Sequence, residues 1–214
     1  MPSDKALVHV IDDDEAMRES LAFLLGTAGI DVQTYESAAA FLEVATKAKA
    51  GCIITDVRMP GISGIELLQR LRELKLGVPV IVITGHGDVP LAVEAMKVGA
   101  IDFLEKPFDD EVLLTSVRSA LNQLDRDHKR QAERSEIDAR LATLSNRERD
   151  VLDGLVGGLA NKQIAYDLGI SPRTIEIYRA NLMTKMQAAS LSDLVRMALI
   201  AGILGSGSDK PKAS

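Results

Sequence analysis

Five short apolar segments, each followed by a helical pattern, restrict the fold of the first 121 residues more than any other feature of the sequence. Strands that alternate with amphipathic helices in this way form a parallel, doubly wound sheet. The sequence therefore predicts an α/β fold with five parallel strands. The strands are expected at residues 7–11, 31–36, 53–56, 78–83 and 101–104, and the helices at 15–28, 37–47, from 63 onward, at 88–98 with Asp88 as N-cap, and at 109–121 with Asp109 as N-cap.

Polar side chains of a defined kind stand at the ends of four of these strands. They are Asp12 and Asp13 after the first strand, Asp56 at the end of the third, Thr84 after the fourth and Lys106 after the fifth. The carboxyl ends of parallel strands share one edge of the sheet, where open α/β sheets bind their ligands. We therefore expect these five side chains to converge on a single site.

Phosphoryl transfer is the chemistry that such a site suits. Three carboxylates in one place repel one another and require a cation, and carboxylate oxygens with waters and phosphate oxygens are the ligands of Mg²⁺. Transfer of a phosphoryl group asks mainly for positioning and charge neutralisation, to which the Lys106 ammonium and the Thr84 hydroxyl would contribute. The sequence thus predicts that Asp56 accepts a phosphoryl group. The expected metal ligands are Asp12, Asp13, Asp56 and the backbone carbonyl of Arg58.

Each of these residues also has an ordinary structural interpretation. The run 12–14 could simply cap the following helix, Thr84 could be a strand-end hydroxyl, and Lys106 could be a surface lysine. His86 could be interpreted as a phosphohistidine, although a loop histidine near an acidic site needs no role. The convergence of all five strand-end residues on one edge favours the phosphoryl site.

Four separated motifs resemble the receiver domain of two-component response regulators over about the first 124 residues. They are Ile11-Asp12-Asp13, Asp56-x-x-Met59-Pro60-x-x-x-Gly64, Thr84-Gly85 and Lys106-Pro107. The resemblance implies a flavodoxin-like sheet of strand order 2-1-3-4-5 and phosphorylation of Asp56 by a sensor histidine kinase. It also implies Mg²⁺ held by Asp12 and Asp13, a cis peptide before Pro107, and a regulator rather than an enzyme.

The same resemblance implies a switch between two states. Phosphorylation would draw Thr84 toward the phosphoryl group, and Phe103 would turn into the space that Thr84 vacates. Many relatives carry Tyr in place of Phe103. Because Phe lacks the hydroxyl group, the two states must differ here by packing alone. The surface that changes would be residues 88–121, the usual dimerisation face of the family, with Val93 and Lys97 as candidate contacts.

The charge of the chain is divided unevenly between its halves. Residues 1–124 carry a net charge of −8 and residues 125–214 a net charge of +2, which indicates a second half suited to nucleic acid. Residues 125–140 hold five basic and five acidic residues without Gly or Pro. They predict a charged helical linker with too little apolar surface to join a core. A basic DNA-binding arm is the alternative, which the balanced charge disfavours.

Three features predict a cytoplasmic protein. No apolar run approaches the roughly 18 residues that span a membrane, and residues 1–5 lack the apolar part of a signal peptide. The single cysteine, Cys52, excludes an internal disulfide and fits a reducing compartment. Because Cys52 lies within an apolar strand, we expect it to be buried packing rather than a reactive thiol.

Four helical patterns follow in residues 141–204, and residues 205–214 are expected to be disordered. Ser145 and Glu148 have capping-box spacing, and Ser171 with Pro172 begins a longer helix. A short helix, a turn containing Gly169 and this longer helix form a helix-turn-helix pattern. The second half therefore predicts an all-α, four-helix DNA-binding domain.

The longer helix, residues 171–186, has two different faces. The stripe expected in the core comprises Ile175, Leu182 and Met186, with Tyr178 alongside. The opposite stripe would enter the major groove, where Glu176 could accept from a cytosine amino group and Ile177 could touch a thymine methyl. The predicted contacts to DNA are Lys162, Arg173, Thr174, Glu176, Ile177, Arg179, Ala180, Asn181 and Lys185.

Residues 141–203 resemble the LuxR/FixJ-type DNA-binding domain, chiefly in the runs 144–152, 158–165 and 170–178. Many relatives carry Lys in place of Glu176 and His in place of Tyr178, so we expect an altered base preference. A four-helix protein-binding module is the alternative, because the charge of this half is nearly neutral.

Taken whole, the chain resembles the FixJ-type regulators. The resemblance implies a transcriptional activator of nitrogen-fixation and microaerobic genes. The implied partners are a haem-containing oxygen-sensor kinase of the FixL type, promoter DNA, RNA polymerase and, after phosphorylation, a second copy of the chain. The alternatives are a related regulator that answers another sensor, a receiver-controlled adaptor that binds protein, and an orphan regulator that needs no phosphate.

Overall fold

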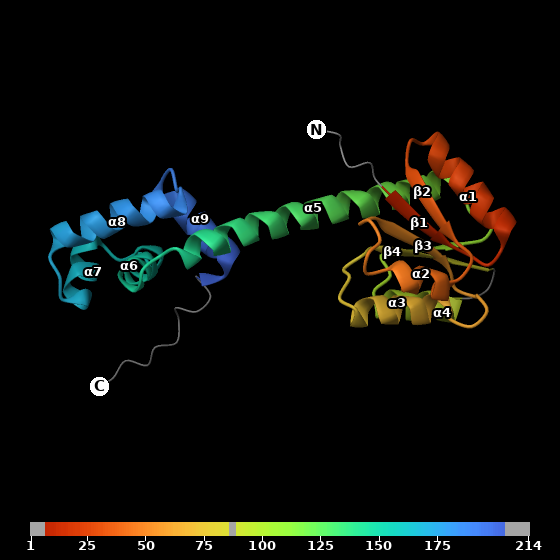
Figure 1. Ribbon diagram of the computed structural model, residues 1–214, viewed down its shortest axis with the longest axis horizontal. Helices are drawn as coiled ribbons and strands as arrows, with labels where there is room; N and C mark the ends of the chain where they lie inside the picture. Colours follow the sequence, from red (N-terminus) through yellow and green to blue (C-terminus); the bar gives the residue numbers. More distant parts are fainter. Residues whose placement is uncertain (1–6, 86–88, 204–214) are drawn as a thin grey trace. The chain divides into compact units, whose positions relative to one another are not determined.

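The computed structural model describes residues 7–85 and 89–203 of the 214-residue chain. The chain divides into two compact units, Met1–Asp127 and His128–Ser214, and each is described below by itself (Figure 1). The predicted N-cap Asp88, the alternative phosphohistidine His86 and the predicted disordered tail 205–214 lie outside the described residues.

The described part of the first unit contains a five-stranded parallel sheet in the order β2-β1-β3-β4-β5, as predicted. Strand β3 is central, and its residue Ile54 pairs with Val10 on one side and with Ile81 on the other. Four of the five residues of β3 are buried, as the continuous apolar run predicts for a strand covered on both faces. The strands are β1 Leu7–Ile11, β2 Asp31–Tyr35, β3 Cys52–Asp56, β4 Val80–Thr84 and β5 Asp102–Glu105.

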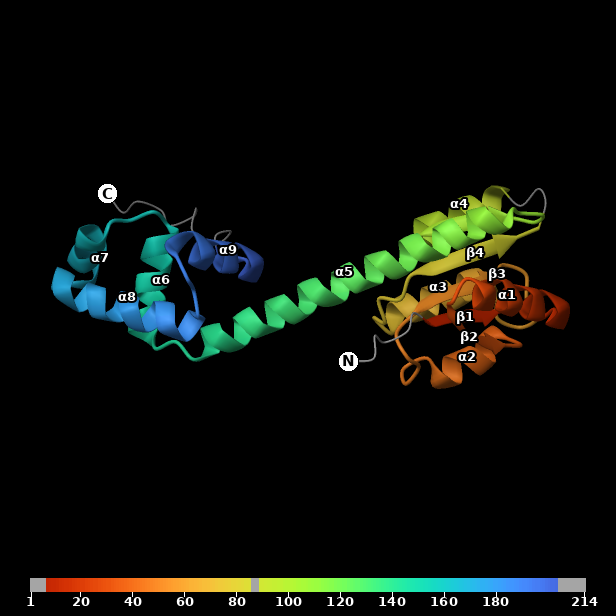
Figure 2. The ribbon, with the colours of Figure 1, turned by 90° about the horizontal axis from the view of Figure 1, so that it is seen from above.

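Helices cover both faces of this sheet (Figures 1 and 2). On one face, Leu25 of α1 and Leu113 of α5 belong to an apolar cluster with the strands. On the other face, Phe41 of α2, Leu67 of α3 and Ala95 of α4 form a second cluster. The helices are α1 Glu15–Thr27, α2 Ala38–Val44, α3 Gly64–Glu73, α4 Val89–Val98 and α5 Asp110–Ala142. Among the described residues, no helix is long and apolar enough to cross a membrane.

Helix α5 continues through the segment that was predicted to be a charged helical linker. One helix spans Asp110–Ala142, so the charged residues 125–140 are helical, as their composition predicts. The expectation that this segment joins no core is wrong at Ile137, which is 3% exposed and packs in the core of the second unit. Leu141 packs against the same cluster. Ile137 and Leu141 lie one helical turn apart on one face of a segment that is otherwise mostly polar and charged.

The described part of the second unit continues with four helices after α5, as predicted. Ser145 caps the first of them in a capping box with Glu148. Gly169 ends the second in the left-handed region, at φ 66°. In the third, the predicted core stripe is buried and Tyr178 packs partly against it. The helices are α6 Asn146–Val156, α7 Asn161–Leu168, α8 Pro172–Met186 and α9 Leu191–Ala201.

Candidate functional site

The Lys106 ammonium lies between two carboxylates at the carboxyl edge of the sheet. Its Nζ is 2.6 Å from Oδ2 of Asp56 and 3.3 Å from Oδ2 of Asp12. Asp12 is 2% exposed, and the Asp56 side chain is 14% exposed. The structure thus brings together the ends of β1, β3 and β5, as the strand-end pattern predicts.

Burial and the attraction between opposite charges shift the pKa values of Asp12 and Lys106. Burial raises the pKa of Asp12, and hydrogen bonding from the Asp14 amide and the charge of Lys106 counteract part of that rise. Burial alone would lower the pKa of Lys106, but its hydrogen bonds to Asp56 and Asp12 and their negative charges outweigh burial and raise it. Lys106 therefore remains a cation at neutral pH, placed to receive further negative charge at Asp56.

Backbone contacts hold both carboxylates in place. The Arg58 amide donates to Oδ1 of Asp56 at 2.9 Å, and the Asp14 amide donates to Oδ1 of Asp12 at 2.9 Å. Arg18 donates from Nη1 to the Asp12 carbonyl at 2.8 Å. It also donates to the carbonyl of Asp13 at 3.1 Å. The contacts of Arg18 were not predicted, although a cation in the first turns of the helix after an acidic loop is a signal for them.

Gly64 explains the spacing of the motif that follows Asp56. A Cβ atom at position 64 would lie 2.2 Å from the backbone oxygen of Asp56. The Gly64 amide also donates to the Val57 carbonyl at 3.0 Å. The loop after β3 therefore returns so close to the acceptor strand that only glycine fits at this position.

The remaining predicted residues of this edge have distinct environments. Thr84 ends β4 and is 2% exposed, and its carbonyl accepts from the Lys106 amide at 2.8 Å. Phe103 is 42% exposed. Asp13 and Arg58 are exposed on the two loops beside the acceptor. The peptide bond between Lys106 and Pro107 is cis, as the resemblance implied.

The donor set at this edge fits a magnesium ion. Across residues 7–85 and 89–203, no three His, Cys, Asp or Glu side chains are grouped so that they could hold a metal. Asp12 and Asp56 nevertheless face a common cation, the Lys106 ammonium. Mg²⁺ prefers one or two protein carboxylates and takes its other ligands from water and phosphate oxygens. Two carboxylates, with Asp13 exposed on the loop directly after Asp12, match that preference.

The predicted dimerisation face presents exposed apolar side chains. Val93 is 48% exposed and Met96 44% exposed on α4, and Val112 is 50% exposed on α5. Lys97 is exposed on α4 as well. Phe103 of β5 is exposed as well, so α4, β5 and the start of α5 each carry exposed apolar side chains.

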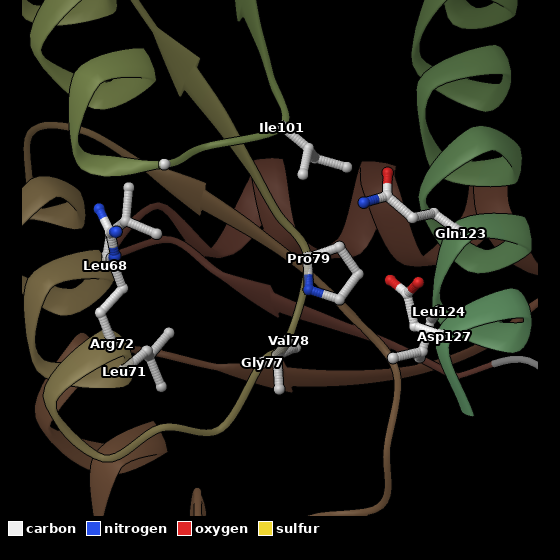
Figure 3. A pocket seen from close by; sticks show the side chains of 11 residues that line it. Leu68, Leu71, Arg72, Gly77, Val78, Pro79, Ile101, Gln123, Leu124 and Asp127 are labelled. Atoms are coloured by element: carbon white, nitrogen blue, oxygen red, sulfur yellow. The ribbon is translucent and has the colours of Figure 1, made fainter. Parts of the chain in front are cut away.

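A pocket of about 260 Å³ lies at the other edge of the same sheet (Figure 3). Its lining includes Arg72, Pro79, Ile101, Gln123 and Asp127. Pro79 and Ile101 directly precede β4 and β5, whereas Asp56 ends β3. The pocket is therefore separate from the carboxylate site and takes no part in its chemistry.

Most of the predicted DNA-contacting residues are exposed. Lys162 on α7 is exposed, as are six predicted residues of α8, and Ile177 is 58% exposed. Three of the predicted residues, among them the exposed Lys185, have partners within the chain. Thr174 shares a hydrogen bond with Ser171 at 2.8 Å, and Arg179 donates to Asn161 at 3.4 Å. Lys185 Nζ lies 2.6 Å from Oε2 of Glu148. The predicted residues of α8 that are exposed are Arg173, Glu176, Ile177, Ala180, Asn181 and Lys185.

Family models match both units of the chain. The response regulator receiver domain matches residues 8–118, and the luxR family of bacterial regulatory proteins matches residues 142–198. The chain belongs to the LuxR-family response regulators. In such a response regulator, the receiver implies a sensor kinase as partner, and the luxR-family domain implies binding to DNA.

Individual proteins resemble this response regulator over nearly its whole length. The transcriptional regulatory protein FixJ of Azorhizobium caulinodans is 63% identical over 92% of this chain and 93% of that protein. FixJ of Bradyrhizobium diazoefficiens is 56% identical over 94% of this chain and 98% of that protein. The crystal structure of full-length FixJ from B. japonicum, 55% identical, matches with a TM-score of 0.60 over 94% of this chain and 100% of that chain. The chain is thus a FixJ-type response regulator that controls transcription in a phosphorylation-dependent manner.

Proposed function

We propose that Asp56 accepts a phosphoryl group from a sensor histidine kinase and that the protein is a regulator rather than an enzyme. The observation that carries this proposal is the position of Lys106, whose Nζ lies 2.6 Å from Asp56. An ammonium held there by two carboxylates is already oriented toward the oxygens of an incoming phosphoryl group. Such prearranged charge is what phosphoryl transfer mainly requires.

Each residue of the edge has one task in this proposal. Asp12, Asp56 and the backbone carbonyl of Arg58 would hold Mg²⁺, with Asp13 acting through water, and the ion would neutralise charge on the phosphoryl oxygens. A carboxylate oxygen of Asp56 attacks phosphorus as the bond from phosphorus to the histidine nitrogen of the kinase breaks, and Lys106 binds a phosphoryl oxygen. The Thr84 hydroxyl donates a hydrogen bond to another.

The added charge then changes the α4–β5–α5 surface. Thr84 moves toward the phosphoryl group and Phe103, which is 42% exposed, turns into the vacated space. Two receivers then pair through the apolar surface that contains Val93 and Lys97. Pairing brings two DNA-binding units to paired half-sites, and the second contact forms at high effective concentration.

The biological setting follows from the similar proteins. Relatives named FixJ at 56% and 63% identity support control of nitrogen-fixation and microaerobic genes in the cytoplasm, with a FixL-type haem oxygen sensor as kinase. RNA polymerase is the partner at the promoter. A related regulator that answers another sensor is the alternative, because the residues at the phosphoryl site do not encode the signal.

Binding to promoter DNA at several salt concentrations tests the proposed output. Contacts to phosphates make the logarithm of the association constant fall linearly with the logarithm of salt concentration. Substitution Lys162→Met is expected to weaken binding at all sequences and to reduce that slope by about one. Arg134→Met removes an exposed cation from α5 and is the control. A chain that acts as a protein-binding adaptor would show no salt-dependent promoter binding.

A further inference from the structure

The end of α5 is part of the DNA-binding unit rather than a spacer before it. Ile137 is 3% exposed in the core cluster that also contains Ile175, Leu182 and Met186 of α8. Arg196 of α9 donates to Glu133 of α5. The three turns of α5 from 133 to 142 therefore pack on, and bond to, the helices that follow.

Arg140 of this segment donates a hydrogen bond to the last residue of α8. Its Nη1 donates to the Met186 carbonyl at 3.0 Å. The Gln187 amide, at the C-cap, donates to the carbonyls of Met183 and Thr184. Arg140 thus binds a carbonyl beyond those that the C-cap amide satisfies, and its positive charge lies at the negative end of the helix dipole.

The Arg140 side chain is itself fixed in place. Its Nη2 lies 2.5 Å from Oε1 of Glu136, one turn earlier on α5. The Arg140 side chain is 19% exposed, whereas that of Glu136 is 65% exposed. A mostly covered guanidinium with two acceptors inside its own unit is arranged for a structural contact rather than for a DNA phosphate.

A second cation holds the same end of α8. Lys185 Nζ lies 2.6 Å from Oε2 of Glu148 and 3.3 Å from the carbonyl of Thr143. The Glu148 side chain is 5% exposed, so this pair is covered on one side. Arg140 and Lys185 therefore tie the carboxyl end of α8 to the end of α5 and to the start of α6.

We propose that Arg140 is a positioning residue for sequence-specific DNA binding. This inference rests on the proposed reading of DNA by α8. Arg140 sets the angle at which the exposed stripe of α8 meets the major groove, and Arg140 itself does not touch DNA. Loss of this contact would impair specific binding, which depends on the alignment of base contacts. Binding to unrelated DNA depends on phosphate charge and would change little.

The test uses the full chain and a duplex selected in vitro on the wild-type protein, beside a duplex of unrelated sequence. We expect Arg140→Met to weaken binding to the selected duplex about tenfold, the effect of one misaligned base contact. Binding to the unrelated duplex and the salt slope should stay unchanged. Arg134→Met is the matched control, because Arg134 on the same helix is 58% exposed and pairs only with exposed Asp138 at 3.7 Å in the described contacts.

Opposite results would overturn the inference. Equal losses on both duplexes with a salt slope smaller by about one would make Arg140 a phosphate contact, and no loss on either would leave it without a role. Glu136→Met, which removes both the charge and the acceptor oxygen, keeps the inference testable if Arg140→Met fails to fold. Removing this exposed carboxylate should strengthen DNA binding by charge alone, whereas loss of its hold on Arg140 should weaken binding to the selected duplex; stronger binding overturns the inference.

A variant of the α8 surface separates this inference from the proposed function. If Ile177→Ala changes which duplex is preferred but Arg140→Met has no effect, α8 reads DNA and the positioning role alone is wrong. If neither variant changes binding to the selected duplex, the reading of DNA by α8 fails as well.

Discussion

At the scale of single residues, one lysine organises the acceptor site. Lys106 Nζ lies within 3.3 Å of carboxylate oxygens on two different strands. Its charge offsets the repulsion between Asp12 and Asp56 and is proposed to stabilise the charge that phosphorylation adds. The pKa of Lys106 is raised, because its hydrogen bonds to Asp56 and Asp12 and their negative charges outweigh the effect of burial.

Substitution Lys106→Met tests this role. We expect phosphorylation by a small phosphodonor with Mg²⁺ to slow about 100-fold, the usual cost of losing one prearranged charge contact. The rate can be followed by separating phosphorylated from unphosphorylated chains over time. Lys47→Met, at an exposed position after α2, should leave the rate unchanged. An equally fast Lys106→Met variant would contradict the role.

His9 gives the receiver a pH-dependent stability. It is 2% exposed, and its Nε2 lies 2.9 Å from the Lys49 carbonyl, so Nε2 carries the proton and donates. Burial lowers the pKa of His9, although the Lys49 hydrogen bond partly opposes this. The unfolded chain therefore binds a proton at higher pH than the folded chain does. Stability is full above about pH 6.5 and falls as the pH decreases toward the lowered value.

The variant His9→Gln checks that dependence. Glutamine retains a side-chain donor but takes up no proton in this range. Unfolding by urea at several values between about pH 7.5 and pH 5.5 should show a larger loss of stability in the wild type than in the variant. Identical slopes in the two proteins would show that His9 does not account for the acid sensitivity.

At the scale of elements, most strands and helices could be predicted because their signals are local. The strand ends at Asp56 and Thr84, the capping boxes at Ser63 and Ser145, and the turn at Gly169 all follow from short stretches of sequence. The convergence of the strand-end residues could also be predicted, because a parallel sheet brings the carboxyl ends of its strands to one edge.

The features that were missed depend on contacts between distant residues. Ile137 is a lone apolar residue in a charged segment, so nothing local marks it as part of a core. The pairing of Lys185 with Glu148 was not predicted, because the two residues lie 37 residues apart in sequence. The same holds for Arg140, whose acceptor at Met186 lies 46 residues away.

The packing of α6 on α7 gives a prediction at this scale. A Cβ atom on Gly154 of α6 would lie 2.7 Å from Cγ1 of Ile164. We expect Gly154→Ala to destabilise the DNA-binding unit by about 1–3 kcal/mol, the usual cost of overpacking. Gly26→Ala in α1 is the matched control: a Cβ there meets nothing within 4 Å, and the better helix former should be neutral or stabilising.

Hydrogen exchange of the full chain can follow both glycine variants. Gly154→Ala should speed the exchange of amides in α6–α8 and leave the receiver sheet unchanged. Unchanged exchange in α6–α8 would mean that α6 and α7 move apart at little cost in stability. In that case the close contact of α6 with α7 does not stabilise the fold.

At the scale of the whole molecule, the proposed phosphoryl acceptor lies in one unit and the DNA-binding helix in the other. The receiver unit offers an acidic, lysine-bridged edge and an apolar association surface. The second unit offers an exposed stripe on α8 held at its carboxyl end by cations from α5 and α8 itself. A change of charge at Asp56 is proposed to control DNA binding through the association of two chains. One DNA-binding unit alone makes few contacts with DNA, so association strengthens binding.

The central claim is that Asp56 is the residue through which phosphorylation controls DNA binding. The direct test is the affinity of the full chain for a selected promoter duplex, with and without a small phosphodonor and Mg²⁺. The wild type and the exposed-carboxylate control Glu43→Gln should both gain at least about tenfold in affinity as two chains associate. Asp56→Asn should gain nothing. An equal gain in Asp56→Asn, or no gain in the wild type, would contradict the account.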